Sequence, residues 1–203
     1  MAVTAADGIV ALLRDGRLAV LPTDTVYGLV CAAFDRQPSA DLYRLKGRDA
    51  IQPTAILTAD VEVLIERIPE LDEHSTAIAR ALLPGPFTLI LPNPARRFGW
   101  LTEGSPDSIG VRVPALTGTT AEIVKQLGVV VATSANLSGG PDPRRLAEVP
   151  AAILAGVAAV VDGGALPGTP STVIDVTGPE PLVLRAGAGD PGAALERIAA
   201  ARG

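Results

Sequence analysis

The sequence Pro22-Thr23-Asp24-Thr25-Val26-Tyr27-Gly28-Leu29 is the stretch on which an interpretation of the fold depends. It follows a short apolar run, residues 18–21, which predicts a buried strand. After the proline the chain places hydroxyls and a carboxylate at the strand's carboxyl end, where open α/β sheets bind ligands. Taken alone, the octet is equally typical of a strand-to-helix turn in which Thr23, Asp24 or Thr25 caps the next helix.

Strands and helices alternate along the chain on both sides of this octet. Several of the expected strands lie too close together for helical crossovers, so we predict a mixed sheet with helices on its faces. The expected strands are 18–21, 52–57, 87–91, 108–113, 129–132, 157–161, 172–176 and 182–184. The expected helices are 4–14, 39–46, 60–67, 74–83, 119–128 and a last one that begins at 190.

Local signals mark the ends of these helices. Ser39 is expected to cap the second helix, and Gly47 to end it. Asp60 is expected to cap the third helix. The pattern Thr119-x-x-Glu122 predicts a capping box at the start of a helix that Gly128 ends.

Length and composition favour one domain with an aliphatic core. The chain has 203 residues, of which 48% are hydrophobic but only 3% aromatic, so Val, Leu, Ile and Ala must fill the interior. No apolar run approaches the roughly 20 residues of a membrane helix, and residues 1–5 do not resemble a secretory signal. The single cysteine, Cys31, excludes an internal disulfide. We therefore expect a cytoplasmic protein with no membrane association.

Charge and the missing motifs exclude several classes of function. The net charge of −5 disfavours nucleic acid as the main ligand, because proteins that bind its backbone usually carry a basic stripe. One histidine, His74, and one cysteine cannot build a zinc site of the usual kind, and we expect no protein metal site. The chain also lacks a phosphate-binding P-loop and a serine nucleophile elbow.

Cations and hydroxyls at strand and helix ends remain as the candidate chemistry. Together they would suit phosphates and carboxylates in one cleft. Lys46 and Arg48 have a second interpretation, since cations also stabilise the carboxyl end of a helix. The full set is Thr25, Lys46, Arg48, Ser108, Arg112, Ser134, Asn136, Ser171 and Arg185.

Arg112 and the loop after residue 132 are the most informative members of this set. Ile109, Val111 and Val113 share one face of an expected strand, which leaves Arg112 on the other, where it needs solvent or an anion. Residues 133–140 form a Ser-, Asn- and Gly-rich loop, which is typical either of an anion-binding nest or of a plain polar loop. The loops 93–107, 139–145 and 163–170 are rich in Pro and Gly, and the last two adjoin candidate residues.

Six motifs in this order resemble the YrdC-like family of threonylcarbamoyl-AMP synthases. The resemblance extends from the octet to Arg185 and implies a twisted α/β fold with an open concave cleft, similar to the dihydroxybutanone-phosphate synthase type. It also implies one domain over residues 1–203, as in the short family members. The motifs are the octet, Lys46-Gly47-Arg48, Pro84-Gly85-Pro86-Phe87-Thr88, Gly110-Val111-Arg112-Val113-Pro114, Thr133-Ser134-Ala135-Asn136-Leu137-Ser138-Gly139 and Ser171-Thr172-Val173.

The resemblance further implies a reaction in which L-threonine, bicarbonate and ATP give threonylcarbamoyl-adenylate and pyrophosphate. The product would go to a transferase that modifies adenosine 37 of tRNA, and Mg²⁺ would arrive with ATP. Lys46 and Arg48 are the expected catalytic residues. The expected ATP-binding residues are Lys46, Arg48, Gln52, Ser108, Asn136, Arg144 and Arg185, and the expected threonine-binding residues are Thr25, Arg112, Ser134 and Ser171.

Two positions depart from the family pattern. Leu57 stands where the family usually has a histidine, which puts a contact to threonine in doubt, and Asp49 replaces a common proline. Leu57 keeps open a paralogue that binds nucleotide or threonine without turnover. The resemblance also leaves open a module that binds double-stranded RNA, as some family members do. The acidic balance argues against RNA as the main ligand.

Overall fold

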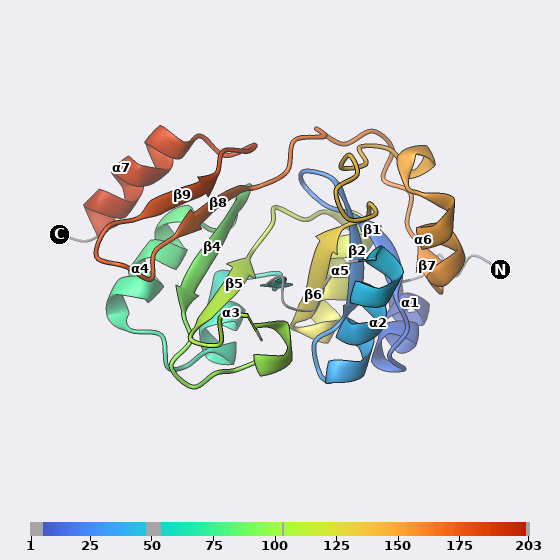
Figure 1. Ribbon diagram of the computed structural model, residues 1–203, viewed down its shortest axis with the longest axis horizontal. Helices are drawn as coiled ribbons and strands as arrows, with labels where there is room; N and C mark the ends of the chain where they lie inside the picture. Colours follow the sequence, from blue (N-terminus) through green and yellow to red (C-terminus); the bar gives the residue numbers. More distant parts are fainter. Residues whose placement is uncertain (1–5, 48–53, 103, 202–203) are drawn as a thin grey trace.

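The computed structural model describes residues 6–47, 54–102 and 104–201, and nine strands within these ranges form one open sheet. Their order across the sheet is β7-β1-β2-β6-β3-β5-β4-β8-β9 (Figure 1). The strands are β1 (Ala19–Pro22), β2 (Tyr27–Ala32), β3 (Ala55–Leu57), β4 (Phe87–Pro92), β5 (Ser108–Arg112), β6 (Val130–Ser134), β7 (Ala159–Val160), β8 (Thr172–Asp175) and β9 (Leu182–Arg185).

The sheet is mixed, as the sequence predicts. Three neighbouring pairs are parallel, namely β1–β7, β3–β5 and β4–β8, and the other five are antiparallel. The short strand β3 lies at the centre, pairing with β6 on one side and β5 on the other. We call β7, β1, β2 and β6 the β1 half of the sheet, and β5, β4, β8 and β9 the β4 half.

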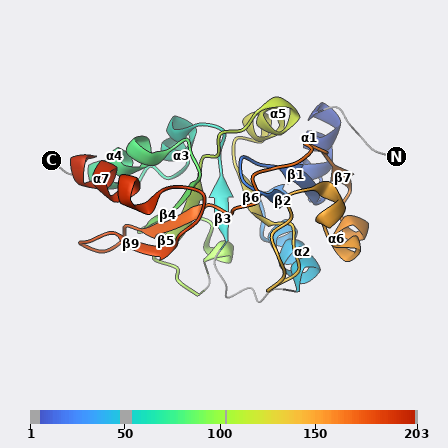
Figure 2. The same ribbon diagram turned by 90° about the horizontal axis from the view of Figure 1, so that it is seen from above.

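Helices cover the sheet on both sides. Seen from above, α1, α3, α4, α5 and α7 lie on one side, and α2 and α6 lie on the other beside the β1 half (Figure 2). This leaves part of the sheet uncovered where the two halves meet. The helices are α1 (Ala6–Arg14), α2 (Arg36–Lys46), α3 (Val61–Arg67), α4 (Glu73–Leu82), α5 (Gly118–Leu127), α6 (Ala151–Gly156) and α7 (Pro191–Ala201), with short 3₁₀ turns at Gly99–Leu101 and Leu146–Glu148.

Side-chain alternation along the strands separates core from cavity. In β4, Phe87, Leu89 and Leu91 are buried in the larger core cluster, while Thr88 and Ile90 point the other way and line a cavity. Burial of a side chain of this size stabilises the fold by roughly 1.5–3 kcal/mol. A smaller core cluster lies between the β1 half and helices α1 and α5.

The octet does not begin a helix, so that interpretation is wrong. Tyr27–Ala32 is strand β2, which runs antiparallel to β1 with Pro22 opposite Tyr27. The Thr23 hydroxyl stabilises the four-residue connection by accepting from the backbone N–H groups of Thr25 and Val26, at 3.2 and 3.3 Å. The hydroxyls therefore cap a hairpin turn, a role that Ser and Thr also fill outside helices.

Two of the expected helix caps are also wrong. Helix α2 begins one turn earlier than expected, and Asp35 rather than Ser39 caps it by accepting from the Gln37 N–H. Helix α5 has Thr117 at its cap position, without a side-chain hydrogen bond, so the capping box at Thr119 does not form. Helix α6, which the sequence analysis did not predict, is short and lacks a side-chain cap.

The remaining end signals are confirmed. Gly47 ends α2 in the left-handed conformation, with φ of 63°, and Asp60 caps α3 by accepting from the Glu62 N–H at 2.7 Å. Gly128 ends α5 with φ of 75°. These signals act within one turn of backbone, which is why a sequence pattern identifies them.

Because β3 joins the two halves, Ile56→Ala should destabilise the whole sheet. The Ile56 side chain is fully buried, and truncation of such a residue leaves a cavity that costs about 2–5 kcal/mol in the free energy of unfolding. Leu184→Ala, which removes an exposed side chain, is the control. Chemical denaturation should show that it changes the free energy of unfolding by no more than about 0.5 kcal/mol. Equal effects of the two substitutions would contradict this role for β3.

Candidate active site

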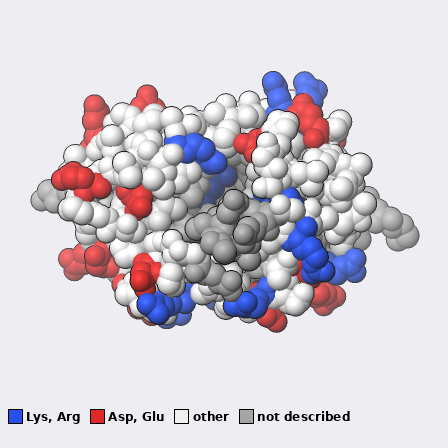
Figure 3. All heavy atoms as spheres, in the orientation of Figure 1, with Lys and Arg blue, Asp and Glu red and all other residues white. Residues whose placement is uncertain are grey.

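A cavity of about 400 Å³ lies where the two halves of the sheet meet. Figure 3 shows it as a hollow near the centre of one face, with basic side chains at its edge and inside it. Its lining comes from both halves, from the carboxyl end of α2 and from the loops after β1, β6 and β7. Residues far apart in the sequence therefore meet in one place.

The floor of the cavity is made of very small residues from four strands. Gly28 on β2 lies opposite Ser134 on β6, and Ala132 on β6 lies opposite Ala55 on β3. Gly110 on β5 comes next, and a Cβ atom built there would lie 3.3 Å from the Ala55 Cα. Small side chains at these positions leave open space above the sheet, which is what a bound ligand requires.

Arg112 connects the β4 half to the octet. Its Nη2 atom donates to Asp24 Oδ1 and, at 2.7 Å, to Thr25 Oγ1. The second oxygen of Asp24 accepts from the Ala115 N–H at 3.1 Å. The sequence analysis required solvent or an anion for Arg112, and the structure provides Asp24 as that anion. The β1–β2 hairpin is thereby fixed to the end of β5.

Burial dominates the electrostatics of Arg112. The side chain is only 10% exposed, and burial lowers the pKa of its guanidinium. The charge of Asp24 opposes that shift, and the nearby charge of Arg185 adds to it. Within the described residues, Nε of Arg112 is buried without a hydrogen-bond partner. An anionic ligand in the cavity would compensate the positive charge of the guanidinium.

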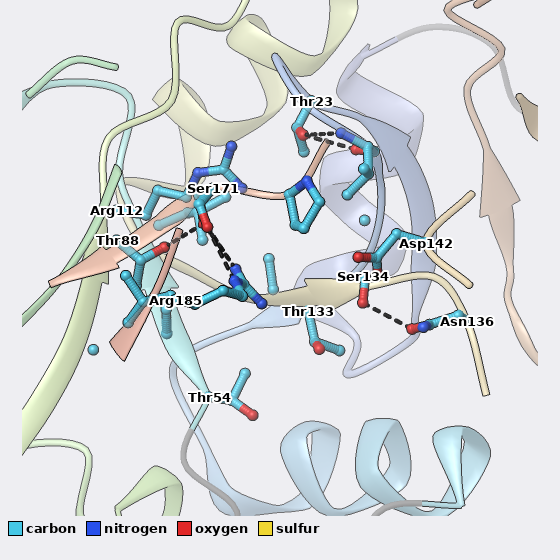
Figure 4. A pocket seen from close by; sticks show the side chains of 18 of the residues that line it. Thr23, Thr54, Thr88, Arg112, Thr133, Ser134, Asn136, Asp142, Ser171 and Arg185 are labelled. Carbon is cyan, nitrogen blue, oxygen red and sulfur yellow. Dashed lines mark hydrogen bonds between the residues drawn. The ribbon is translucent and has the colours of Figure 1, made fainter. Parts of the chain in front are cut away.

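The carboxyl end of α2 forms one wall of the cavity. Lys46 is 4% exposed, and its Nζ donates to the backbone oxygens of Ser134 and Asn136, at 2.7 and 2.9 Å, and to Asn136 Oδ1. The Ser134 hydroxyl also donates to Asn136 Oδ1, at 2.7 Å (Figure 4). The Lys46 ammonium thus holds the loop after β6 in place and puts positive charge beside it.

The opposite wall is built on β8 and β9. The Ser171 and Thr88 hydroxyls share a hydrogen bond of 2.8 Å, and Arg185 donates to the Ser171 backbone oxygen through Nε and Nη2, at 3.1 and 2.8 Å (Figure 4). Ser171 is buried, but the Arg185 side chain is exposed and lines the cavity. This wall presents hydroxyls and one guanidinium to a ligand.

Tyr27 fixes the segment that passes between the two walls. Its buried hydroxyl lies 2.9 Å from both Asp162 Oδ1 and the Gly164 backbone oxygen, and accepts from the Gly163 N–H. Burial, together with the hydrogen bond to Asp162, raises the pKa of the Tyr27 phenol. From here residues 163–171 cross from the β1 half to the β4 half along the upper edge of Figure 1. On the way, the Gly168 N–H donates to the Thr25 backbone oxygen at 2.8 Å.

The structure brings most of the expected site residues to this cavity. Lys46, Arg112, Ser134, Asn136, Ser171 and Arg185 line it. Thr25 is fully buried, and its hydroxyl contacts two residues of the cavity lining, Arg112 and Thr23. Arg48 and Gln52 lie outside the described residues.

Two expected residues besides Thr25 lie outside the cavity lining. Ser108 is at the start of β5, on the same face as Gly110, and its hydroxyl donates to the Ser105 backbone oxygen at 3.3 Å. Arg144 is exposed, and its backbone oxygen accepts from the Leu166 N–H at 2.8 Å. Contact of either side chain with a nucleotide stays a prediction.

The sequence analysis missed several polar residues that line the cavity. Thr88 could have been found from the alternation in 87–91, which places it opposite the core residues. Asp142 lies in the Pro- and Gly-rich loop 139–145, where no local pattern singles it out. The missed residues are Thr23, Thr54, Thr88, Thr133, Ser138 and Asp142.

Comparison with known proteins agrees with this geometry. A family model for Sua5, YciO and YrdC proteins, described as "Telomere recombination", matches residues 11–187. The chain belongs to the Sua5/YciO/YrdC family. A threonylcarbamoyl-AMP synthase of Pyrococcus abyssi is 35% identical over 92% of this chain and 54% of its own length. A putative threonylcarbamoyl-AMP synthase of Mycobacterium tuberculosis is 30% identical over 88% of this chain and 82% of its own length.

A solved structure of the family supports the fold. The crystal structure of P. abyssi Sua5 complexed with L-threonine matches with a TM-score of 0.83 and 33% identity, over 95% of this chain and 56% of that one. The chain thus spans about half the length of these Pyrococcus relatives. The twisted mixed sheet flanked by helices is the family's fold.

The Asp24–Arg112 pair should be more important for stability than an exposed ion pair. Asp24→Asn keeps the shape of the side chain but leaves the buried guanidinium uncompensated, which should cost about 3–5 kcal/mol in the free energy of unfolding. Urea denaturation of Asp15→Asn is the matched control. Asp15 is exposed, and its side chain has no hydrogen bond within the described residues. If Asp24→Asn and Asp15→Asn have the same free energy of unfolding, the Asp24–Arg112 pair does not stabilise the position of the hairpin.

Proposed function

We propose that this chain is a threonylcarbamoyl-AMP synthase, which makes threonylcarbamoyl-adenylate and pyrophosphate from L-threonine, bicarbonate and ATP. The proposal rests on one observation, a cavity in which Lys46, Arg112 and Arg185 meet hydroxyls from both halves of the sheet. This supports a site for anions, and the family relatives named above supply the specific reaction.

ATP phosphates would bind near the wall formed by Lys46, Ser134 and Asn136. Because the Lys46 donors already bind the loop after β6, its main contribution would be positive charge and a rigid loop rather than a direct hydrogen bond. Arg48 and Gln52 would add contacts from the adjoining segment. Arg185, on the exposed edge of the cavity, would lie near the nucleotide.

L-Threonine would bind with its carboxylate near Arg112. Asp24 and Thr25 occupy Nη2 of the guanidinium, so a substrate carboxylate would use the other terminal nitrogen, Nη1. Ser134 and Ser171 line the cavity on either side and would contact the rest of the amino acid. This arrangement places threonine between the two walls.

The reaction would depend on positioning and charge neutralisation. The threonine amine, after loss of its proton, would combine with bicarbonate to give a carbamate and water. An oxygen of the carbamate would then attack the α-phosphorus in line with the departing pyrophosphate. Lys46 and Arg48, the residues that we propose as catalytic, would stabilise the charge that develops on the phosphate oxygens.

Mg²⁺ would arrive as part of the ATP substrate. Within the described residues no three His, Cys, Asp or Glu side chains are grouped as ligands for a metal ion. Mg²⁺ is commonly held by substrate phosphates together with one or two carboxylates, and the phosphates of ATP would carry the ion into the cavity.

Because of Leu57, the second candidate function is that of a non-catalytic paralogue, which binds nucleotide without turnover. Leu57 lines the cavity directly beside Arg112, its partner in the β3–β5 register, and offers no hydrogen bond where the family pattern has a histidine. Incubation of the protein with L-threonine, bicarbonate and radiolabelled ATP distinguishes the candidates. Threonine-dependent release of pyrophosphate with formation of the adenylate supports the enzyme, and ATP binding without turnover supports the paralogue.

The product would pass to a tRNA threonylcarbamoyl transferase, and we propose a cytoplasmic location for both steps. No helix in the described residues is long and apolar enough to cross a membrane. A net charge of −5 and the scattered basic side chains on the face in Figure 3 argue against RNA as a direct ligand.

Arg112→Lys should raise the KM for threonine roughly tenfold or more, because lysine keeps the charge but loses the planar fork, and each charged hydrogen bond contributes about 1.5–3 kcal/mol. The Kd for ATP without threonine should stay within about twofold. Steady-state kinetics and calorimetry measure the two quantities. L-Threonine amide, which lacks the carboxylate charge, should discriminate less between parent and variant.

Thermal unfolding is measured alongside, because Arg112 also pairs with Asp24. A folded Arg112→Lys variant with a normal KM for threonine would show that the substrate carboxylate binds elsewhere.

Binding to duplex RNA at physiological salt should be no tighter than non-specific binding, with a Kd of roughly 10⁻⁴–10⁻⁶ M by analogy with DNA. Fluorescence anisotropy with a labelled RNA duplex at several salt concentrations tests this. Nanomolar, salt-tolerant binding would instead favour an RNA-binding module.

A further inference from the structure

Asp142 contributes the one carboxylate among the described residues that line the cavity. It lies between Pro141 and Pro143 in the loop after β6, and the Pro143 backbone oxygen accepts from the Tyr27 N–H at 2.9 Å. The loop is thus fixed to the start of β2. In Figure 4 the Asp142 side chain lies beside Ser134, on the same side of the cavity as Asn136.

No positively charged side chain among the described residues pairs with the Asp142 carboxylate. The half-buried carboxylate forms no hydrogen bond or ion pair with a described residue. Asp24 differs in this respect, because its carboxylate accepts from Arg112 and from the Ala115 N–H. A carboxylate that faces a cavity without a partner is available to a cation from solution.

The position of Asp142 decides which cation it would bind. It shares its wall with Asn136, Ser138 and Gly139, where the proposed function places the ATP phosphates. A carboxylate beside phosphates repels them unless a cation lies between the two. Mg²⁺ takes oxygen ligands of both kinds, commonly one or two carboxylates together with substrate phosphates.

The ammonium group of the amino acid is the alternative cation. It would lie close to the substrate carboxylate and hence to Arg112. In Figure 4, Arg112 and Asp142 lie on opposite sides of the cavity. This separation favours the metal ion over the ammonium group.

We propose that Asp142 is the carboxylate through which this protein binds the Mg²⁺ ion of Mg·ATP. The inference rests on the proposed function, since it requires ATP phosphates on the Lys46 side of the cavity. Asp142 would turn a general anion site into one that prefers ATP with its metal ion over free ATP.

The test compares ATP binding with and without Mg²⁺ by calorimetry, for the parent, for Asp142→Asn and for Asp15→Asn. Mg²⁺ should tighten ATP binding to the parent and to the Asp15→Asn control by the same factor. In Asp142→Asn this factor should fall at least tenfold, and free ATP should bind as tightly as to the parent or tighter, because a repulsive charge is gone. Proton relaxation of water with Mn²⁺·ATP as the probe should show a weaker ternary complex for Asp142→Asn.

Each contrary result has a separate meaning. If the parent binds no ATP under any condition, the proposed function fails, and this inference fails with it. If the parent binds ATP but Asp142→Asn keeps the full effect of Mg²⁺, the inference alone is overturned. A higher KM for threonine with an unchanged effect of Mg²⁺ would likewise overturn it and assign Asp142 to the ammonium group.

Discussion

The buried ion pair between Arg112 and Asp24 is the contact on which the geometry of the cavity depends. It joins the β1–β2 hairpin to the end of β5, and Asp24 also holds the backbone at Ala115. Among the described strands of the sheet, the two halves pair only through β3, a strand of three residues. Since one charge of the pair would be very unfavourable alone in the interior, the hairpin and β5 have one favoured arrangement.

The octet serves structure and chemistry at once. Thr23 closes the hairpin turn, Asp24 and Thr25 orient Arg112, and Tyr27 anchors the segment 163–171. The contact that Thr23 makes is local, whereas Asp24, Thr25 and Tyr27 contact residues that are distant in the sequence. A ligand that binds Arg112 therefore meets a guanidinium whose position is already fixed, which lowers the entropy lost on binding.

The two walls of the cavity differ in character. The Lys46 wall combines a buried ammonium group with a loop of hydroxyls and amides, whereas the Arg185 wall is more exposed and built on an edge strand. The glycine and alanine floor leaves the space between the walls open. A larger side chain at Gly110 would also press on Ala55 of β3. This asymmetry suits two ligands with different charges, one on each side of Arg112.

The sequence by itself determined the mixed sheet, most of its strands and helices, and six of the residues that line the cavity. Alternation and end signals act over a few residues, so strands such as 87–91 and ends such as Gly47 could be predicted. The set Lys46, Arg112, Asn136 and Ser171 followed from motifs whose chemistry suits anions. The hairpin at the octet could not be distinguished from a helix start, because Thr and Asp stabilise both kinds of turn.

Only the tertiary structure decided which charges are paired and which face the ligand. Asp24 and Asp142 are both aspartates in loops that follow a strand, and nothing in the local sequence separates them. The fold places Arg112 against Asp24 and leaves Asp142 beside the cavity, because strand order and register bring distant residues together. Pairing of charges depends on distance and burial, and both arise from contacts between residues that are about 90 positions apart in the chain.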